Sequence, residues 1–176
     1  MKNQQISLKP QDLVVLLKLA CTPEQRLSYA SIAKTLFMSA SEVHGCVVRA
    51  KIARLAASDQ DGGTTVDRRS LRELLLHGAQ FVFPAVMGPV TRGVPTAHAS
   101  PALNQELVQS DEPPPVWPFA KGSVRGVALY PLYPTVPKAA EIDPQLYRSL
   151  ALFDALRAGR SRERDLASAA LSNILL

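Results

Sequence analysis

The residues best suited to chemistry lie between residues 28 and 54, where hydroxyl, imidazole, ammonium and guanidinium groups recur within two short amphipathic stretches. Such groups donate hydrogen bonds to phosphates and to the edges of bases. They fall mostly outside the apolar stripes of the two stretches, so we expect them at the surface. The candidate contact residues are Lys34, Ser39, Ser41, Glu42, His44, Gly45, Arg49, Lys51 and Arg54.

Catalytic and metal chemistry find little support in the sequence. The histidines at positions 44, 77 and 98 have no cysteine or carboxylate at the spacing of a metal site, and neither CxxC nor HExxH occurs. The glycine-rich phosphate loop and the GxGxxG and GxSxG motifs are also missing. We therefore expect no enzymatic activity, no metal and no cofactor.

Two helices around a short turn must position the candidate residues. Ile32, Ala33 and Leu36 have the spacing of one buried helical face, and Ser28 precedes them as an N-cap. Ser39 begins the second helix, and Glu42 completes a capping box with it. The predicted buried stripe of this second helix consists of Val43, Cys46, Val47, Ala50 and Leu55.

The pattern IAxxLxxSxxEV at residues 32 to 43 resembles the helix-turn-helix of bacterial winged-helix transcription regulators, the broad group that includes MarR-like repressors. A preceding helix from Pro10 to Ala20 is the expected support. The sequence departs from the family at Phe37, where glycine is usual, because a bulky residue adopts a positive φ at greater cost. Gly45 within the second helix costs about 1 kcal/mol relative to alanine, and it permits close approach of DNA or of a packed neighbour.

The resemblance implies a sequence-specific transcription regulator, and a repressor is the expected kind. Such a protein binds double-stranded operator DNA as a homodimer and places its second helix in the major groove. The residues expected to meet base edges are Glu42, His44 and Arg49. Those expected to meet the phosphate backbone are Lys34, Ser39, Ser41, Lys51 and Arg54. The alternative is a protein-interaction module, such as an antitoxin or adaptor, built on the same fold.

The distribution of charge agrees with a phosphate-binding N-terminal half. Residues 1–99 contain 12 Lys and Arg against 7 Asp and Glu, a balance of +5, whereas residues 100–176 contain 8 of each. The whole formal net charge of +5 therefore belongs to the half that contains the two helices. Cationic side chains that neutralise phosphates release counterions and so favour binding.

The sequence as a whole predicts a mainly α fold with a small β component. We divide it into a winged helix-turn-helix at 1–99, a proline-rich β and loop segment at 100–142, and two C-terminal helices at 143–176. Alternating apolar residues at 79–99 predict a hairpin that would serve as the wing, with Arg92 near its tip. Asp67 is expected to cap a helix that Gly78 ends.

Two features of the second half leave alternatives open. Trp117 lies in a segment rich in proline and either docks on the protein as a clasp or is offered to a protein partner. The helices that begin at Pro144 and Ser161 have apolar stripes suited to a dimer or, equally, to an intramolecular core. If an effector ligand controls the regulator, its pocket would be lined by Trp117, Tyr130 and Tyr133.

The sequence predicts a cytoplasmic chain. It has no run of 18 apolar residues that could span a membrane, and its first ten residues, MKNQQISLKP, lack the apolar core of a secretion signal. Cys21 and Cys46 both fall in apolar helical patterns, so we expect reduced thiols rather than a disulfide.

Overall fold

The computed structural model describes residues 5–22, 26–105 and 112–176, and it is mainly helical with a small β component. The first part consists of three helices followed directly by an antiparallel hairpin. These elements are α1 (Pro10–Ala20), α2 (Tyr29–Leu36), α3 (Ala40–Ile52), β1 (Ala56–Ser58) and β2 (Thr64–Val66). A nearly continuous helical stretch comes next, made of α4 (Arg68–Glu73), the π-helical turn η1 (Leu74–Gly78) and α5 (Ala79–Val82).

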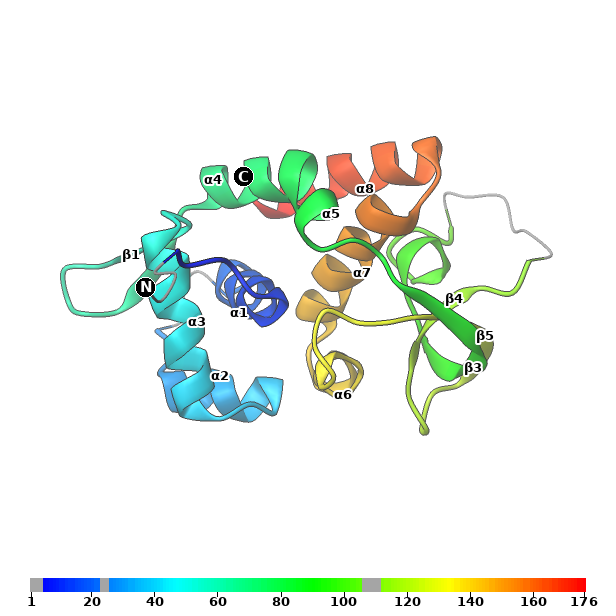
Figure 1. Ribbon diagram of the computed structural model, residues 1–176, viewed down its shortest axis with the longest axis horizontal. Helices are drawn as coiled ribbons and strands as arrows, with labels where there is room; N and C mark the ends of the chain where they lie inside the picture. Colours follow the sequence, from blue (N-terminus) through cyan, green and yellow to red (C-terminus); the bar gives the residue numbers. More distant parts are fainter. Residues whose placement is uncertain (1–4, 23–25, 106–111) are drawn as a thin grey trace.

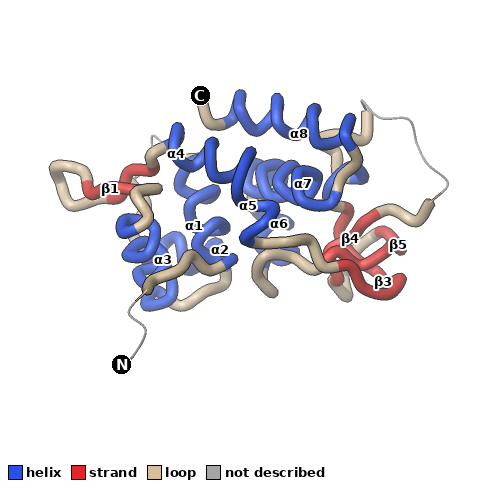
Figure 2. Tube along the Cα trace, turned by 45° about the horizontal axis from the view of Figure 1, so that its top comes forward, coloured by secondary structure: helices blue, strands red, loops and turns tan. Residues whose placement is uncertain are grey.

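The second part surrounds a long central helix. Its elements are β3 (Met87–Pro95), η2 (Ala97–Ala99), β4 (Pro115–Pro118), β5 (Val124–Leu129), α6 (Val136–Ile142), α7 (Pro144–Ala158) and α8 (Ser161–Ile174). Strand β3 pairs antiparallel with both β4 and β5, which pair in parallel with each other. Figures 1 and 2 show α2 and α3 at one end of the molecule and β3–β5 at the other, with α7 between them.

Helix α1 lies at the centre of the N-terminal part. Every residue from Asp12 to Ala20 is buried, including two charged side chains. The carboxylate of Asp12 binds Arg49 of α3, and the ammonium of Lys18 lies 2.7 Å from Oδ2 of Asp143. Oδ1 of Asp143 accepts the amide hydrogen of Leu146 and so caps α7. Ion pairs therefore join α1 to both α3 and α7.

A second buried carboxylate, Asp154 of α7, organises the C-terminal part. Its Oδ2 accepts hydrogen bonds from Thr96 Oγ1 at 2.8 Å and from Trp117 Nε1 at 2.6 Å, and its Oδ1 binds Arg157. Burial raises the pKa of Asp154, whereas these donors favour its charged form. Trp117 is 1 % exposed, so its aromatic ring is a clasp within the core, and the interpretation that offers it to a partner is wrong.

Most predicted helix boundaries are confirmed. Helix α1 begins at Pro10, and side-chain oxygens cap four other helices, three of them at the predicted residues Ser28, Ser39 and Asp67. These capping residues are Ser28, Ser39, Asp67 and Asp143. The prediction that Gly78 ends a helix is wrong. Gly78 keeps a right-handed backbone, and Leu75, Ala79 and Phe83 continue one buried helical face through it.

The hairpin predicted at residues 79–99 is also wrong. Residues 79–82 are helical, and β3 takes its partners from β4 and β5, which follow later in the chain. Arg92 is therefore an exposed residue of β3 opposite Arg125, at the end of the molecule far from α3 (Figure 1). The hairpin that adjoins α3 is β1–β2, whose strands of three residues are too short for a clear alternating pattern.

The apolar stripes of the two C-terminal helices are used inside the molecule. All residues of α7 from Ser149 to Leu156 are buried, and α8 packs on α7 through Ala167 and Leu171. The intramolecular alternative therefore accounts for these stripes. Within the described residues, none of the helices combines the length and apolar character needed to cross a membrane.

The Asp154 cluster predicts a large loss of stability in Asp154→Ala. The substitution leaves the guanidinium of Arg157, whose side chain is 4 % exposed, buried without its counter-ion. Loss of one partner of a buried ion pair costs about 3 to 5 kcal/mol. Urea unfolding should show this decrease, whereas Asp165→Ala on the exposed side of α8 should stay within about 0.5 kcal/mol of the wild type. Equal stability of the two variants would contradict the role of the cluster.

Candidate nucleic-acid interface on helix α3

Helix α3 has one buried and one exposed face. The buried face consists of Val43, Cys46, Val47 and Ala50, as predicted, and it packs on α1 and α2. On the opposite face, Ser41 and His44 are exposed, and Val48 and Ile52 are 41 % and 55 % exposed. These side chains follow one another at helical spacing and form the α3 outer face, defined as Ser41, His44, Val48 and Ile52.

The turn between α2 and α3 is short, and Phe37 is its first residue. This residue adopts the left-handed conformation, with φ 54° and ψ 43°, and ends α2. Ser39 then caps α3 by accepting the amide hydrogen of Glu42 at 3.1 Å. The Phe37 ring is half-exposed, and Lys138 Nζ lies 3.9 Å from its centroid. Phe37 therefore occupies a left-handed position at which the family that the sequence resembles usually has glycine.

Arg49 does not extend from the α3 outer face. Its Nη2 and Nε donate to the two carboxylate oxygens of Asp12 at 2.7 and 2.8 Å. Asp12 is fully buried and also accepts the amide hydrogen of Lys9. The hydrogen bond with Asp12 raises the pKa of Arg49, so the guanidinium stays charged. The interpretation of Arg49 as a base contact is therefore replaced by a structural role.

The position of Arg49 also explains Gly45. A Cβ atom at Gly45 would lie 3.3 Å from Nη1 of Arg49, a tight contact. The missing side chain leaves room for the guanidinium, and an alanine here would require Nη1 of Arg49 to shift by a few tenths of an ångström. Beneath this pair, burial raises the pKa of Cys46 to about 12, so its thiol stays neutral. Cys21 and Cys46 are both free thiols.

Glu42 is engaged by the second half of the chain. Its Oε1 accepts the hydroxyl hydrogen of Tyr133 at 2.8 Å, and this bond raises the pKa of Tyr133. Only the Ser39 half of the predicted capping box is therefore formed. Thr135 Oγ1 donates to the carbonyl of Leu36 at 2.7 Å. The segment before α6 thus braces the turn that leads into α3, and Glu42 is not free to meet a base.

The remaining predicted contact residues surround the α3 outer face unevenly. Lys34 of α2 and Arg54 after α3 are exposed, and Lys51 Nζ donates to Ser58 Oγ at 2.8 Å. The His44 ring packs edge-on against Tyr29, with centroids 5.5 Å apart. Sequence reasoning placed Val48 outside the buried stripe but missed Ile52 as a member of the exposed face. The available signal was that Ile52 lies four residues after Val48 and eight after His44.

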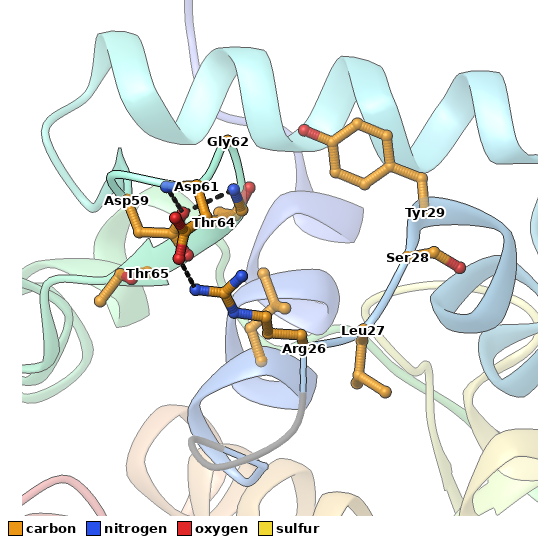
Figure 3. Close-up of a pocket in the computed structure, with 11 residues that line it drawn as sticks. Arg26, Leu27, Ser28, Tyr29, Asp59, Asp61, Gly62, Thr64 and Thr65 are labelled. Atoms are coloured by element: carbon orange, nitrogen blue, oxygen red, sulfur yellow. Dashed lines mark hydrogen bonds and ion pairs between the residues drawn. The ribbon is translucent and has the colours of Figure 1, made fainter.

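A hollow of about 560 Å³ lies between the chain entering α2 and the tip of the β1–β2 hairpin (Figure 3). Arg26 and Asp61 form an ion pair across it, with both side chains more than 60 % exposed. Asp59 Oδ1 accepts the amide hydrogens of Asp61 and Gly63, so this carboxylate holds the hairpin tip together. The tip is therefore acidic, which disfavours its contact with phosphate.

The described residues contain no group of three or more His, Cys, Asp or Glu side chains that could hold a metal ion. The three aromatic residues expected to line an effector pocket lie in different places. Trp117 binds Asp154 in the core, Tyr130 lines a surface groove, and Tyr133 binds Glu42. In comparisons with known proteins, no family model, curated protein or solved structure matches the chain. The function must therefore be inferred from the arrangement around α3.

The Asp12–Arg49 pair predicts that Arg49→Ala destabilises the whole N-terminal part. The variant would leave a fully buried carboxylate without its cation, at a cost of about 3 to 5 kcal/mol in the free energy of unfolding. Chemical denaturation followed by circular dichroism measures this cost, and Lys34→Ala, which removes an exposed cation, is the matched control. If Arg49→Ala proved as stable as Lys34→Ala, the structural role of Arg49 would be refuted.

Proposed function

We propose that the chain is a DNA-binding transcription regulator that places α3 in the major groove. The observation that carries this proposal is the α3 outer face. It lies on a helix of 13 residues, follows a short turn after α2 and has its opposite side buried on α1 and α2. The hairpin β1–β2 follows α3, which is the element order of a winged helix. The resemblance of residues 32–43 to MarR-like regulators agrees with this order.

The surrounding charges support contact with the DNA backbone. Lys34 and Arg54 are exposed, and Lys51 is partly exposed at the C-terminal end of α3. Ser39 uses an oxygen lone pair to cap α3, which leaves its hydroxyl hydrogen to donate to a phosphate. Three cations near one helix predict a salt-dependent affinity, because each phosphate neutralised releases a counterion.

Base recognition would then depend on small and weakly polar groups. With Arg49 and Glu42 engaged inside the molecule, the side chains left on the α3 outer face include Ser41, His44 and Val48. His44 can donate a hydrogen bond to a base edge, and Val48 can contact the methyl group of thymine. We therefore propose a modest specificity per base pair, in which direct contacts come mainly from His44 and Val48.

A protein-interaction module, such as an antitoxin or adaptor, remains the second candidate because of two observations. Val48 and Ile52 make half of the α3 outer face apolar, and Phe37 is half-exposed at its beginning. The neighbouring hairpin tip contains Asp59 and Asp61. An apolar centre beside acidic groups suits a protein surface better than a phosphate backbone.

Selection from a random library of double-stranded DNA, followed by fluorescence anisotropy, distinguishes the two candidates. A regulator should enrich a defined motif, and three phosphate contacts predict a slope of about −3 for log affinity against log salt. Lys34→Ala should reduce that slope by about 1 for all sequences. His44→Ala should cost about 1 to 3 kcal/mol at one base-pair position.

Lys121→Ala is the matched control, because Lys121 is an exposed cation in the turn between β4 and β5. Its variant should bind DNA as the wild type does. No enriched motif, together with an affinity that does not respond to salt, would reject DNA binding and favour the protein-interaction module.

A further inference from the structure

Arg148 of α7 is an exposed arginine that borders two hollows of the surface. One hollow, of about 420 Å³, lies between α7 and the segment that follows η2. The other, of about 220 Å³, lies between α7, the ends of α1 and α8, and the start of α4. Of the described residues, none forms a hydrogen bond or ion pair with the Arg148 side chain. Its guanidinium is therefore a cation that a ligand in either hollow can use.

The larger hollow, which we call the α7 hollow, is mainly apolar. Its first wall is one face of α7, because positions 144, 148 and 151 follow one another at helical spacing. Its second wall is the segment 100–102, directly after η2, and η2 itself packs on α7. Apart from Arg148, the lining residues are Ser100, Pro101, Ala102, Pro144, Tyr147 and Ala151.

The two hydroxyl groups in these walls are already bound inside the protein. The hydroxyl of Tyr147 donates to the last carbonyl of β3 at 2.7 Å, and the tyrosine ring packs edge-on against Trp117. The hydroxyl of Ser100 donates to a carbonyl of η2, also at 2.7 Å. The walls of the α7 hollow are thus preformed, and among its lining side chains only Arg148 has hydrogen-bond donors that are not already used.

The charges around Arg148 favour an anion. No Asp or Glu is among the described residues that line either hollow, and the smaller hollow adds a second guanidinium, that of Arg68. Asp143 at the start of α7 is paired with Lys18, with Oδ2 and Nζ 2.7 Å apart. Burial raises the pKa of Tyr147 to about 12, so its hydroxyl stays neutral. An anion at Arg148 would therefore meet cations and neutral groups.

We propose that the α7 hollow binds a small organic carboxylate, with the apolar body of the ligand against the walls and its carboxylate on Arg148. A guanidinium and a carboxylate fit each other through two parallel hydrogen bonds. The volume of about 420 Å³ lies within the range of small-molecule sites, about 300 to 1,000 Å³, and the lining has the usual character of one polar anchor in apolar surroundings. This inference goes beyond DNA binding and does not depend on it.

The donors in the α7 hollow favour a carboxylate over other small ligands. Inorganic phosphate has more oxygens to satisfy and no apolar part, whereas a single side chain here offers donors that are not already used. A sugar needs polar partners on several sides, but the hydroxyls of Ser100 and Tyr147 already donate to backbone carbonyls. An uncharged apolar ligand would gain nothing from Arg148. A carboxylate with an apolar body uses both the walls and the cation.

Isothermal titration calorimetry of the full chain with octanoate, in the absence of DNA, tests the proposal. For a ligand of about ten non-hydrogen atoms, we expect a Kd of about 0.1 to 1 mM. Arg148→Gln should raise this Kd at least about tenfold, because the charged partner of the carboxylate is lost. Octanamide, the neutral analogue, should bind the wild type more weakly than octanoate does, and Arg148→Gln should change its Kd by less than about twofold.

Two further variants test the site. Arg162→Gln is the matched control, because Arg162 is an exposed arginine of α8 that lines neither hollow. This variant should bind octanoate as the wild type does. Ala102→Trp places a large ring in the α7 hollow from a half-buried position, so it should abolish the binding of both octanoate and octanamide. Circular dichroism verifies that each variant is folded.

Amide chemical shifts of the ¹⁵N-labelled chain locate the bound octanoate. The signals of Ala102, Tyr147 and Arg148 should shift, and those of the α3 outer face should not. Absence of binding at about 10 mM octanoate, or an unchanged affinity in Arg148→Gln, would overturn the proposal. Shifts centred on the α3 outer face would overturn it too, because octanoate would then be bound by exposed apolar residues there. DNA affinity is measured separately, so failure of this site leaves the proposed function unaffected.

Discussion

The carboxylate of Asp12 is the constraint on which the orientation of α3 depends. It is fully buried in α1, and Arg49 supplies its counter-ion and two of its hydrogen bonds. A buried carboxylate without these donors would be costly, so α3 must present Arg49 toward α1. This orientation sets which residues of α3 remain outside, namely Ser41, His44, Val48 and Ile52. Gly45 lies beside this guanidinium, where an added Cβ would be 3.3 Å from Nη1 of Arg49.

Three of the side-chain bonds that join the two halves of the chain lie on α1 or on the turn into α3. Lys18 of α1 binds Asp143 at the start of α7, Tyr133 binds Glu42, and Thr135 binds the carbonyl of Leu36. The last two bonds reach the turn and the first residues of α3. The orientation of α3 is therefore fixed from α1 on one side and from the segment before α6 on the other. In the proposed function, this bracing holds the α3 outer face rigid before DNA is bound.

Local features of the fold could be predicted from the sequence. Capping serines and aspartates, Pro10, and apolar residues at helical spacing act within a few residues of one another, and the corresponding helices are observed. The roles of Arg49 and Glu42 could not be predicted in this way. Their partners are 37 and 91 residues away in the sequence, and periodicity contains no information about such pairs.

The pairing of the β-strands could not be predicted from the local sequence either. Strand β3 is paired with strands that follow after η2, and β1 and β2 are too short to show an alternating pattern. Phe81, Phe83 and Ala85 alternate as in a strand, but residues 79–82 continue the helical face that begins at Leu71 and Leu75. Tertiary packing therefore decided between two patterns that the local sequence could not separate. The predicted wing and the position of Arg92 were wrong for this reason.

The proposed function requires that α3 is anchored by Arg49 and that it meets DNA through the face that this anchor leaves outside. Titration of the ¹⁵N-labelled chain with a selected DNA duplex, followed by amide chemical shifts, tests it most directly. If the proposed function is correct, the amide signals of Ser41, His44, Gly45 and Val48 shift together, while those of the β3 residues around Arg92 do not shift. Shifts centred on β3, or no shift along α3 at any DNA concentration, would contradict the account.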